Sequence, residues 1–215
     1  ESLVGCGYLE QAKGAPEPDR IVPKVLDKLS DLVDLENCFF TTDVGQHQVW
    51  AANYLKCEKP HQFISSCGLG TMGYGIPAAV GAQVACPDAT VVAVTGDGSF
   101  QMVMYELGTI MEQKLPVKIL LFNNQALGMV RQLQYHYVGK RYSNVLFQCD
   151  IDFSKIFEAY GFKTYRIESE DEIEAVLKEA LADPSCALIE CRVPMPDNCS
   201  PITLGGANIN DMVNC

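Results

Sequence analysis

Apolar residues follow two different spacings along most of the chain. Between Ile21 and Val33 they recur every three or four residues, which predicts an amphipathic helix. Residues 38–42 (CFFTT) form a short run of the kind expected for a buried strand. The same reasoning predicts further strands at 62–65, 91–95, 117–122, 163–167 and 186–193, and further helices at 50–54, 73–86, 101–114, 153–160 and 171–181.

Strands that alternate with helices form βαβ units, whose strands are parallel and need cover on both faces. We therefore expect an α/β fold: a doubly wound, mostly parallel sheet of about six strands with helices on both faces. Residues 16–195 would form this domain. Residues 1–15 lack periodicity and are expected to be a linker or N-terminal arm, and 196–215, with Pro, Gly and Asn, a C-terminal tail.

The composition is that of an ordinary soluble domain, with 48% apolar and 20% charged residues among 215. A net charge of −11 argues against nucleic acid or an anionic membrane surface as a partner, because both need clustered Lys and Arg. No apolar run approaches the roughly 20 residues of a membrane span, and no signal peptide is visible.

Ten cysteines raise the question of disulfides or a zinc site. No Cys-x-x-Cys pair occurs, and four cysteines lie inside apolar runs, where a free thiol behaves as a small apolar side chain: Cys38, Cys86, Cys186 and Cys191. We expect free cysteines and a reducing cytoplasmic location.

Candidate chemistry appears where two of the predicted strands end. The strand at 91–95 runs into Gly96-Asp97-Gly98, and the strand at 117–122 is followed by Asn123-Asn124. The carboxyl ends of neighbouring parallel strands are where ligands bind in open α/β sheets. A carboxylate and an amide oxygen suit Mg²⁺, which commonly couples such oxygens to phosphate, and glycines let backbone N–H groups approach that phosphate. Gly-Asp-Gly alone is a common turn, but the asparagines after a strand–helix–strand unit favour a metal–diphosphate site of the kind found in thiamine-diphosphate enzymes.

A second glycine motif competes with this interpretation. Residues 68–73 (GLGTMG) match G-x-G-x-x-G after a short strand and before a helix, which alone suggests NAD or FAD binding. That motif needs an acidic residue at the end of the following strand to hold the ribose. Asp88 precedes the strand instead, and Asp97, which ends it, is flanked by glycines as a metal ligand would be. Close helix–sheet packing and backbone approach to a ligand are the favoured roles for these glycines.

Several segments resemble the C-terminal diphosphate-binding domain of acetolactate synthase (acetohydroxyacid synthase) catalytic large subunits. They are 42–52 (TDVGQHQVWAA), 68–83 (GLGTMGYGIPAAVGAQ), 95–100 (TGDGSF) and 117–132 (VKILLFNNQALGMVRQ). The metal–diphosphate motif is common to thiamine-diphosphate enzymes, whereas the first two segments are more specific to this family. The resemblance spans nearly residues 20–195, and the order and spacing of these segments fit the family throughout.

The resemblance implies a set of site residues. Asp97, Asn124 and the Ala126 carbonyl would bind Mg²⁺, and Met72 would wedge the cofactor into its bent conformation. The full set of implied cofactor-binding residues is Val44, Gly45, Gln46, His47, Gly70, Met72, Gly96, Asp97, Gly98, Ser99, Asn124, Ala126, Leu127, Gly128, Met129 and Val130. Without the resemblance, His47 would pass as a surface histidine, Met72 as core filling and Trp50 as packing or interface.

The resemblance also implies an activity: decarboxylation of pyruvate on thiamine diphosphate and carboligation to a second 2-oxo acid, in branched-chain amino-acid biosynthesis. The activating glutamate of the family lies on a pyrimidine-binding domain of another subunit, so no catalytic residue is expected in this chain. FAD would be bound mostly by a further domain, the assembly would be a homodimer or homotetramer, and a regulatory small subunit is possible in such enzymes. We expect these 215 residues to be inactive alone.

Two alternatives stay open at this point: another thiamine-diphosphate enzyme, such as a 2-oxo acid decarboxylase or glyoxylate carboligase, and a non-catalytic binding module of the same fold. Gln46-His47-Gln48 argues against the first, and intact Asp97 and Asn124 argue against the second. Leu133 stands where several family members carry a tryptophan that favours 2-oxobutyrate, which puts that preference in doubt.

Overall fold

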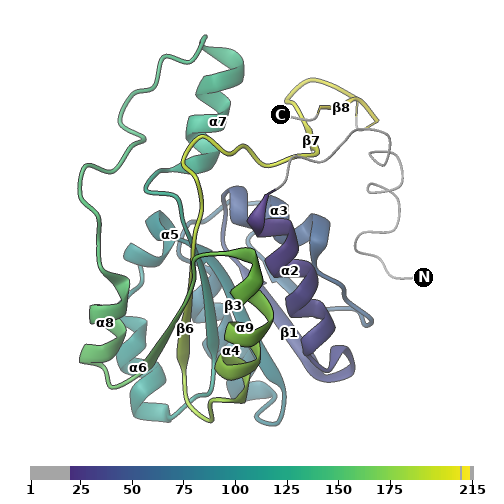
Figure 1. Ribbon diagram of the computed structural model, residues 1–215. Coiled ribbons are helices and arrows are strands. Elements are labelled where there is room, and N and C mark those ends of the chain that lie inside the picture. The colour runs from purple at the N-terminus through teal and green to yellow at the C-terminus, as the bar shows by residue number, and fades with distance from the viewer. Residues whose placement is uncertain (1–19, 209, 214–215) are drawn as a thin grey trace.

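Six parallel strands form the centre of the protein (Figure 1). The computed structural model describes residues 20–208 and 210–213. The strands are β1 (Cys38–Thr42), β2 (Phe63–Ser65), β3 (Thr90–Gly96), β4 (Lys118–Asn123), β5 (Lys163–Ile167) and β6 (Ala187–Arg192). Their order in the sheet is β2-β1-β3-β4-β6-β5, and each neighbouring pair is parallel. The expected α/β fold is confirmed, with a sheet that is parallel throughout.

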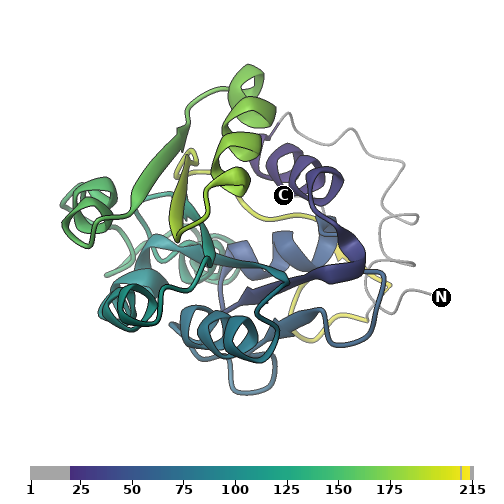
Figure 2. The same cartoon turned by 90° about the horizontal axis from the view of Figure 1, so that it is seen from below.

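Helices cover both faces of this sheet, as the view along it shows (Figure 2). One face carries α2 (Ile21–Leu32), α3 (Gln46–Tyr54) and α9 (Ile173–Ala182); the other carries α4 (Gly75–Ala85), α5 (Asp97–Gln101), α6 (Glu106–Gln113) and α8 (Phe153–Ala159). Helix α7 (Gly128–Tyr137) stands beyond the carboxyl ends of the strands. Short 3-10 turns occur at Leu35–Asn37 and Glu170–Glu172, and β7 (Ile202–Thr203) pairs antiparallel with β8 (Met212–Val213).

The apolar strands serve two separate cores. Val92 and Val94 of β3 face the core under α2, α3 and α9, whereas Val91 and Ala93 face the core under α4, α6 and α8. A strand buried on both faces is expected to be apolar along nearly its whole length, which explains the nearly continuous apolar runs in the sequence. Burial raises the pKa of the Cys186 and Cys191 thiols to about 12, so these cysteines pack as apolar side chains.

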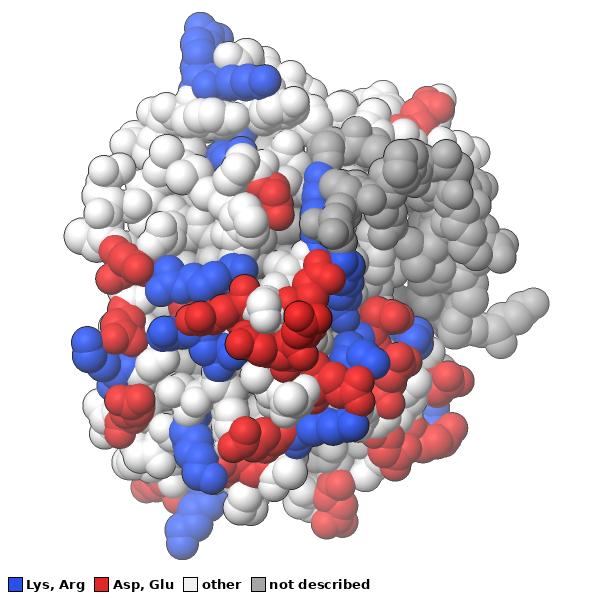
Figure 3. Space-filling model, in the orientation of Figure 1, with Lys and Arg blue, Asp and Glu red and all other residues white. Residues whose placement is uncertain are grey.

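The outer surfaces of the helices carry charges of both signs (Figure 3). Lys24 lies 2.5 Å from Glu170 and Lys28 lies 3.2 Å from Glu174, which connects α2 with the segment that begins α9. None of the helices in the described part of the chain combines the length and apolar character that crossing a membrane requires.

Two stretches differ from the expected elements. The helix predicted at 101–114 is two helices, because a turn at 102–105 separates α5 from α6. The break lets α5 hold residues 97–99 at the sheet edge while Leu107 and Ile110 of α6 pack on the sheet. Helix α7 was not among the predicted elements, although Met129, Val130 and Leu133 have helical spacing.

Residues 197–201 lie against the helices at the carboxyl edge of the sheet. Gln132 of α7 accepts the Cys199 N–H at 2.8 Å and donates to the Cys199 carbonyl at 2.9 Å. Arg131 donates to the Asn198 side chain at 3.0 Å, and both Asn198 and Cys199 are buried. This part of the segment predicted as a tail therefore packs on α7.

Candidate functional site

A cavity of about 210 Å³ lies at the carboxyl ends of β1, β3 and β4. Each of these strands turns there into a helix, so three strand–helix corners form its walls. The lining residues are Val44, Gly45, Gln46, His47, Trp50, Met72, Gly96, Asp97, Gly98, Ser99, Phe122, Asn124, Ala126, Leu127, Gly128, Met129 and Val130.

The corner between β3 and α5 presents Asp97 to the cavity. One carboxylate oxygen, Oδ1, accepts the Gly98 N–H at 2.8 Å. The other, Oδ2, is buried and has no hydrogen-bond partner among the described residues. Burial raises the pKa of Asp97 to about 6, although the N–H groups of Gly98, Gln125 and Ala126 stabilise its charged form. An unsatisfied buried carboxylate oxygen in a cavity indicates a site for a cation.

The corner between β4 and α7 places Asn124 and Ala126 beside Asp97. Asn124 Oδ1 accepts the Ala126 N–H at 3.1 Å, and Gln125 between them has a left-handed backbone with φ 54°. Residues 125–127 form a short bridge with 145–147, in which Leu127 N–H donates to Val145 and Phe147 N–H donates to Gln125. Neither bond uses the Ala126 carbonyl, which can therefore serve another partner.

The corner between β1 and α3 contributes Gln46 and His47. Gln46 accepts from Asn124 Nδ2 at 3.0 Å and donates to Gln132 at 2.8 Å. The imidazole Nε2 of His47 hydrogen-bonds to Asp43, whose other oxygen accepts from Thr95 Oγ1 at 3.0 Å. His47 is thus fixed inside the protein, on the helical turn that follows Asp43.

Two glycines, Gly96 and Gly98, leave the backbone beside Asp97 free of side chains. A Cβ atom at Gly98 would lie 2.8 Å from Leu127 Cδ2 and 3.5 Å from Met72 Cε. A Cβ atom at Gly96 would lie 3.0 Å from His47 Nδ1. Larger residues at either position would fill the space beside Asp97, so glycine is required for a close backbone approach by a ligand.

Every residue predicted for the site except Gly70 lines this one cavity. Gly70 lies just outside, where its Cβ would be 3.7 Å from Val44, and its φ of +62° suits glycine. Leu133 is half-exposed on α7, one turn beyond Val130.

Three residues that support or line the site were not predicted for it: Asp43, Trp50 and Phe122. Asp43 was not among the predicted site residues, yet it is fully buried and holds His47. Its spacing of four residues from His47 was the available signal, once α3 is known to begin at Gln46. Trp50 packs edge-on against Phe122 at 6.4 Å, and both side chains line the cavity.

The donors around the cavity fit a hard divalent cation. Asp97 supplies a free carboxylate oxygen, and Asn124 and the Ala126 carbonyl supply neutral oxygens, as Mg²⁺ prefers. No group of three or more His, Cys, Asp or Glu side chains suited to a metal occurs among residues 20–208 and 210–213. Free thiols stand at Cys38, Cys57, Cys67, Cys86, Cys149, Cys186 and Cys191. The carboxylate–amide–carbonyl set is the one that fits the cavity.

Comparison with known proteins places the chain in a family. Residues 43–191 match the family described as "Thiamine pyrophosphate enzyme, C-terminal TPP binding domain". The chain belongs to this family, as the resemblance in the sequence implied, and the match favours thiamine diphosphate over a dinucleotide at the glycine-rich segment.

Individual relatives are named acetolactate synthases. The chain is 47% identical to an acetolactate synthase large subunit of Porphyra purpurea over 83% of this chain and 30% of that protein. It is 44% identical to the isozyme 2 large subunit of Escherichia coli K12, over 89% of this chain and 35% of that protein. It is 40% identical to the mitochondrial catalytic subunit of Saccharomyces cerevisiae, over 96% of this chain and 30% of that protein. The chain spans about a third of the length of the relatives it matches.

Proposed function

We propose that this member of the thiamine pyrophosphate enzymes binds the diphosphate of thiamine diphosphate through Mg²⁺ in the cavity at the carboxyl edge of its sheet. The observation that carries the proposal is the buried Oδ2 of Asp97 beside Asn124, which has no hydrogen-bond partner within residues 20–208 and 210–213. A buried carboxylate without a counter-charge is costly, and a bound cation would remove that cost.

Each strand end has a part in this binding. Asp97, Asn124 and the Ala126 carbonyl would hold Mg²⁺. The backbone at Gly96 and Gly98, with the Ser99 hydroxyl and His47, would contact the diphosphate, and Met72 and Leu127 would lie against the organic part of the cofactor. Thiamine diphosphate, when bound, supplies the electron sink for the reaction, while the protein supplies orientation and electrostatics.

The activity we propose is that of acetolactate synthase: decarboxylation of pyruvate and carboligation to a second 2-oxo acid. The cavity of about 210 Å³ is smaller than the roughly 300–1,000 Å³ of a complete small-molecule site. We infer that a pyrimidine-binding domain of another subunit, with its activating glutamate, completes it, and that FAD would be held mostly outside these residues. The 215 residues alone are then expected to form no acetolactate from pyruvate.

Calorimetry with thiamine diphosphate and Mg²⁺ tests the binding site. Asp97→Asn keeps the shape of the side chain but removes its charge, so we expect at least about 100-fold weaker binding, or about 2.7 kcal/mol. Asp88→Asn is the matched control, because Asp88 is an exposed acid just before β3 and should leave binding unchanged. Equal binding by wild type and Asp97→Asn would overturn the proposal.

A panel of second substrates separates the alternatives within the family. Acetolactate formation from pyruvate by the full-length protein would support the proposed activity, whereas release of an aldehyde would favour a 2-oxo acid decarboxylase. A full-length protein that binds no cofactor would favour a non-catalytic module. Leu133 predicts no strong preference for 2-oxobutyrate in this panel.

A further inference from the structure

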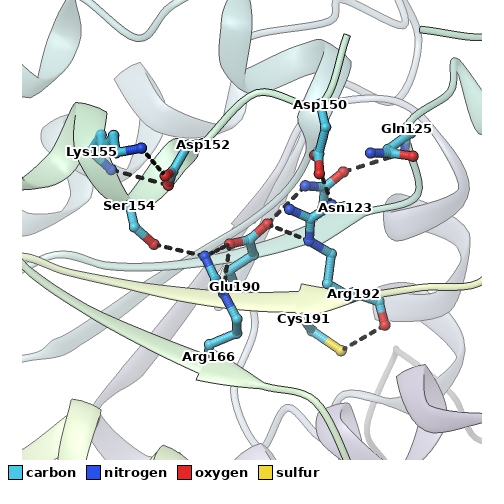
Figure 4. A network of polar contacts seen from close by, with 10 residues as sticks. All are labelled: Asn123, Gln125, Asp150, Asp152, Ser154, Lys155, Arg166, Glu190, Cys191 and Arg192. Atoms are coloured by element: carbon cyan, nitrogen blue, oxygen red, sulfur yellow. Dashed lines mark hydrogen bonds and ion pairs between the residues drawn. The ribbon is translucent and has the colours of Figure 1, made fainter. Parts of the chain in front are cut away.

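A fully buried carboxylate lies beside the metal-binding corner but outside the cavity. Glu190 of β6 has a side chain that is 0% exposed. Arg192 Nε lies 3.0 Å from its Oε1, and Arg166 Nη2 lies 3.3 Å from its Oε2 (Figure 4). These ion pairs balance its charge in the interior. They leave open why a carboxylate stands between the buried side chains of Ile189 and Cys191 in β6.

The third partner of Glu190 is Asn123, which lies next to the metal-binding corner. Asn123 donates its Nδ2 to Glu190 Oε1 at 2.8 Å, and its own Oδ1 accepts the Gln125 N–H at 3.3 Å. A carboxylate only accepts hydrogen bonds, so the amino end of the Asn123 amide must face Glu190. The oxygen end must then face the loop that follows, which fixes the orientation of this amide.

A second route from Glu190 reaches the same loop. Arg192, paired with Glu190, also lies 2.8 Å from Asp150 Oδ1. Hydrogen bonds from Arg192 and from the Gln125 side chain hold the pKa of Asp150 below its usual value. Both routes converge on Gln125.

Gln125 is the residue of the loop that most needs support. Its φ of 54° is unusual for a residue with a side chain, and such conformations persist only where the surroundings hold them. It stands between Asn124 and Ala126, so its backbone conformation decides where the Asn124 side chain and the Ala126 carbonyl point.

We propose that Glu190 is a positioning residue for the metal site: it orients Asn123 and thereby holds Gln125 in the conformation that presents Asn124 and Ala126 to the cation. The inference rests on the proposed function of the cavity. Partners that orient metal ligands typically change metal affinity by 10–100-fold when they are replaced.

Mn²⁺ is the probe, titrated into the full-length protein by electron paramagnetic resonance with thiamine diphosphate present. Asn123→Ala removes both hydrogen bonds but leaves the Glu190 ion pairs in place. Glu190→Gln removes the charge and one of its two accepting oxygens. We expect Mn²⁺ to bind about 10–100-fold more weakly to each variant.

The matched control is a second buried carboxylate, Asp183, which lies near the amino ends of β5 and β6 and therefore away from the carboxyl ends that form the cavity. Asp183 accepts from Ser185 N–H at 2.9 Å and Tyr165 Oη at 3.1 Å, and it lies 3.1 Å from Lys163 Nζ. Asp183→Asn should lower the melting temperature and leave Mn²⁺ affinity unchanged. An equal loss of affinity in this control would mean that any loss of stability weakens the site, and it would overturn the inference.

The remaining outcomes separate the inference from the function on which it rests. Wild-type Mn²⁺ affinity in folded Asn123→Ala and Glu190→Gln would refute the role of Glu190 while leaving the site intact. Wild-type affinity in Asp97→Asn would refute the metal site itself. If Glu190→Gln does not fold, Asn123→Ala decides the matter, because it keeps both arginine–glutamate pairs.

Discussion

The first residue of α7 is where the site leaves least room for a side chain. A Cβ atom at Gly128 would lie 2.1 Å from Gln46 Oε1 and 2.5 Å from Asn124 Nδ2. The first distance is 1.3 Å short of ordinary contact, which begins at 3.4 Å. Gly128→Ala must therefore push apart the two side chains that join the β1 corner to the β4 corner.

Gln46 cannot move without losing other bonds. It donates to Gln132 at 2.8 Å and to the Asp197 carbonyl at 3.0 Å, and it accepts from Asn124 at 3.0 Å. Losing two of these bonds at about 1 kcal/mol each, with about 1–3 kcal/mol for overpacking, outweighs a helix gain of about 0.5–1 kcal/mol. We expect Gly128→Ala to lower the free energy of unfolding by about 2–4 kcal/mol.

Urea unfolding and calorimetry check both consequences of Gly128→Ala. Cofactor binding with Mg²⁺ should weaken by about 10–100-fold, because Asn124 is displaced. Gly81→Ala on α4 is the matched control: its Cβ meets nothing within 4 Å, so the same change should stabilise the protein by about 0.5–1 kcal/mol and leave binding unaltered. If Gly128→Ala had the stability and cofactor affinity of wild type, the neighbouring side chains would have made room for the new methyl group without loss of free energy, and the predicted loss would be refuted.

Three further substitutions test other parts of the structure. Phe157→Ala empties the core position where Phe157 stacks on Phe100 at 5.4 Å, and we expect a loss of about 3–5 kcal/mol in urea unfolding. Asp43→Asn weakens the support of His47, so cofactor affinity in calorimetry should fall by about tenfold or more while Mg²⁺ is held constant. Burial raises the pKa of Asp183, but hydrogen bonds outweigh this and hold it well below the usual value of about 3.9. The stabilisation that the Asp183 carboxylate contributes to folding is therefore complete above the unfolded pKa and is lost as pH falls through the folded pKa. Asp183→Asn should lower the free energy of unfolding by about 1.5–3 kcal/mol at pH 7. The difference in unfolding free energy between this variant and wild type should shrink below about pH 4.

The strands of the fold were the easiest part to predict from the sequence. Residues 91–95 and 117–122 are apolar at almost every position, as expected for strands of a sheet covered on both faces. The turn inside the predicted helix 101–114 could not be seen, since the break depends on how α5 and α6 meet the sheet. The spacing of apolar residues alone does not show where the chain changes direction between α5 and α6.

The support beneath the site was hidden for a different reason. Glu190 was visible as a lone acid in the predicted strand 186–193, and such a residue must find a partner when it is buried. Its neighbour Arg166 lies opposite it on β5, and β5 pairs with β6 at the end of the sheet order. That pairing and its register come from the three-dimensional arrangement, and the sequence pattern does not contain them.

Side chains connect two of the three pairs of strand ends around the cavity. Thr95 binds Asp43 and so joins the β3 end to the β1 end, and Gln46 binds Asn124 and joins β1 to β4. Between β3 and β4, Asp97 meets the N–H groups of the loop but keeps one oxygen unpartnered within the described residues. A cation shared by Asp97 and Asn124 would supply the third connection. In the proposed function, the metal is thus both the anchor of the diphosphate and the missing link between two strand ends, which explains why the supports converge on the loop at Gln125.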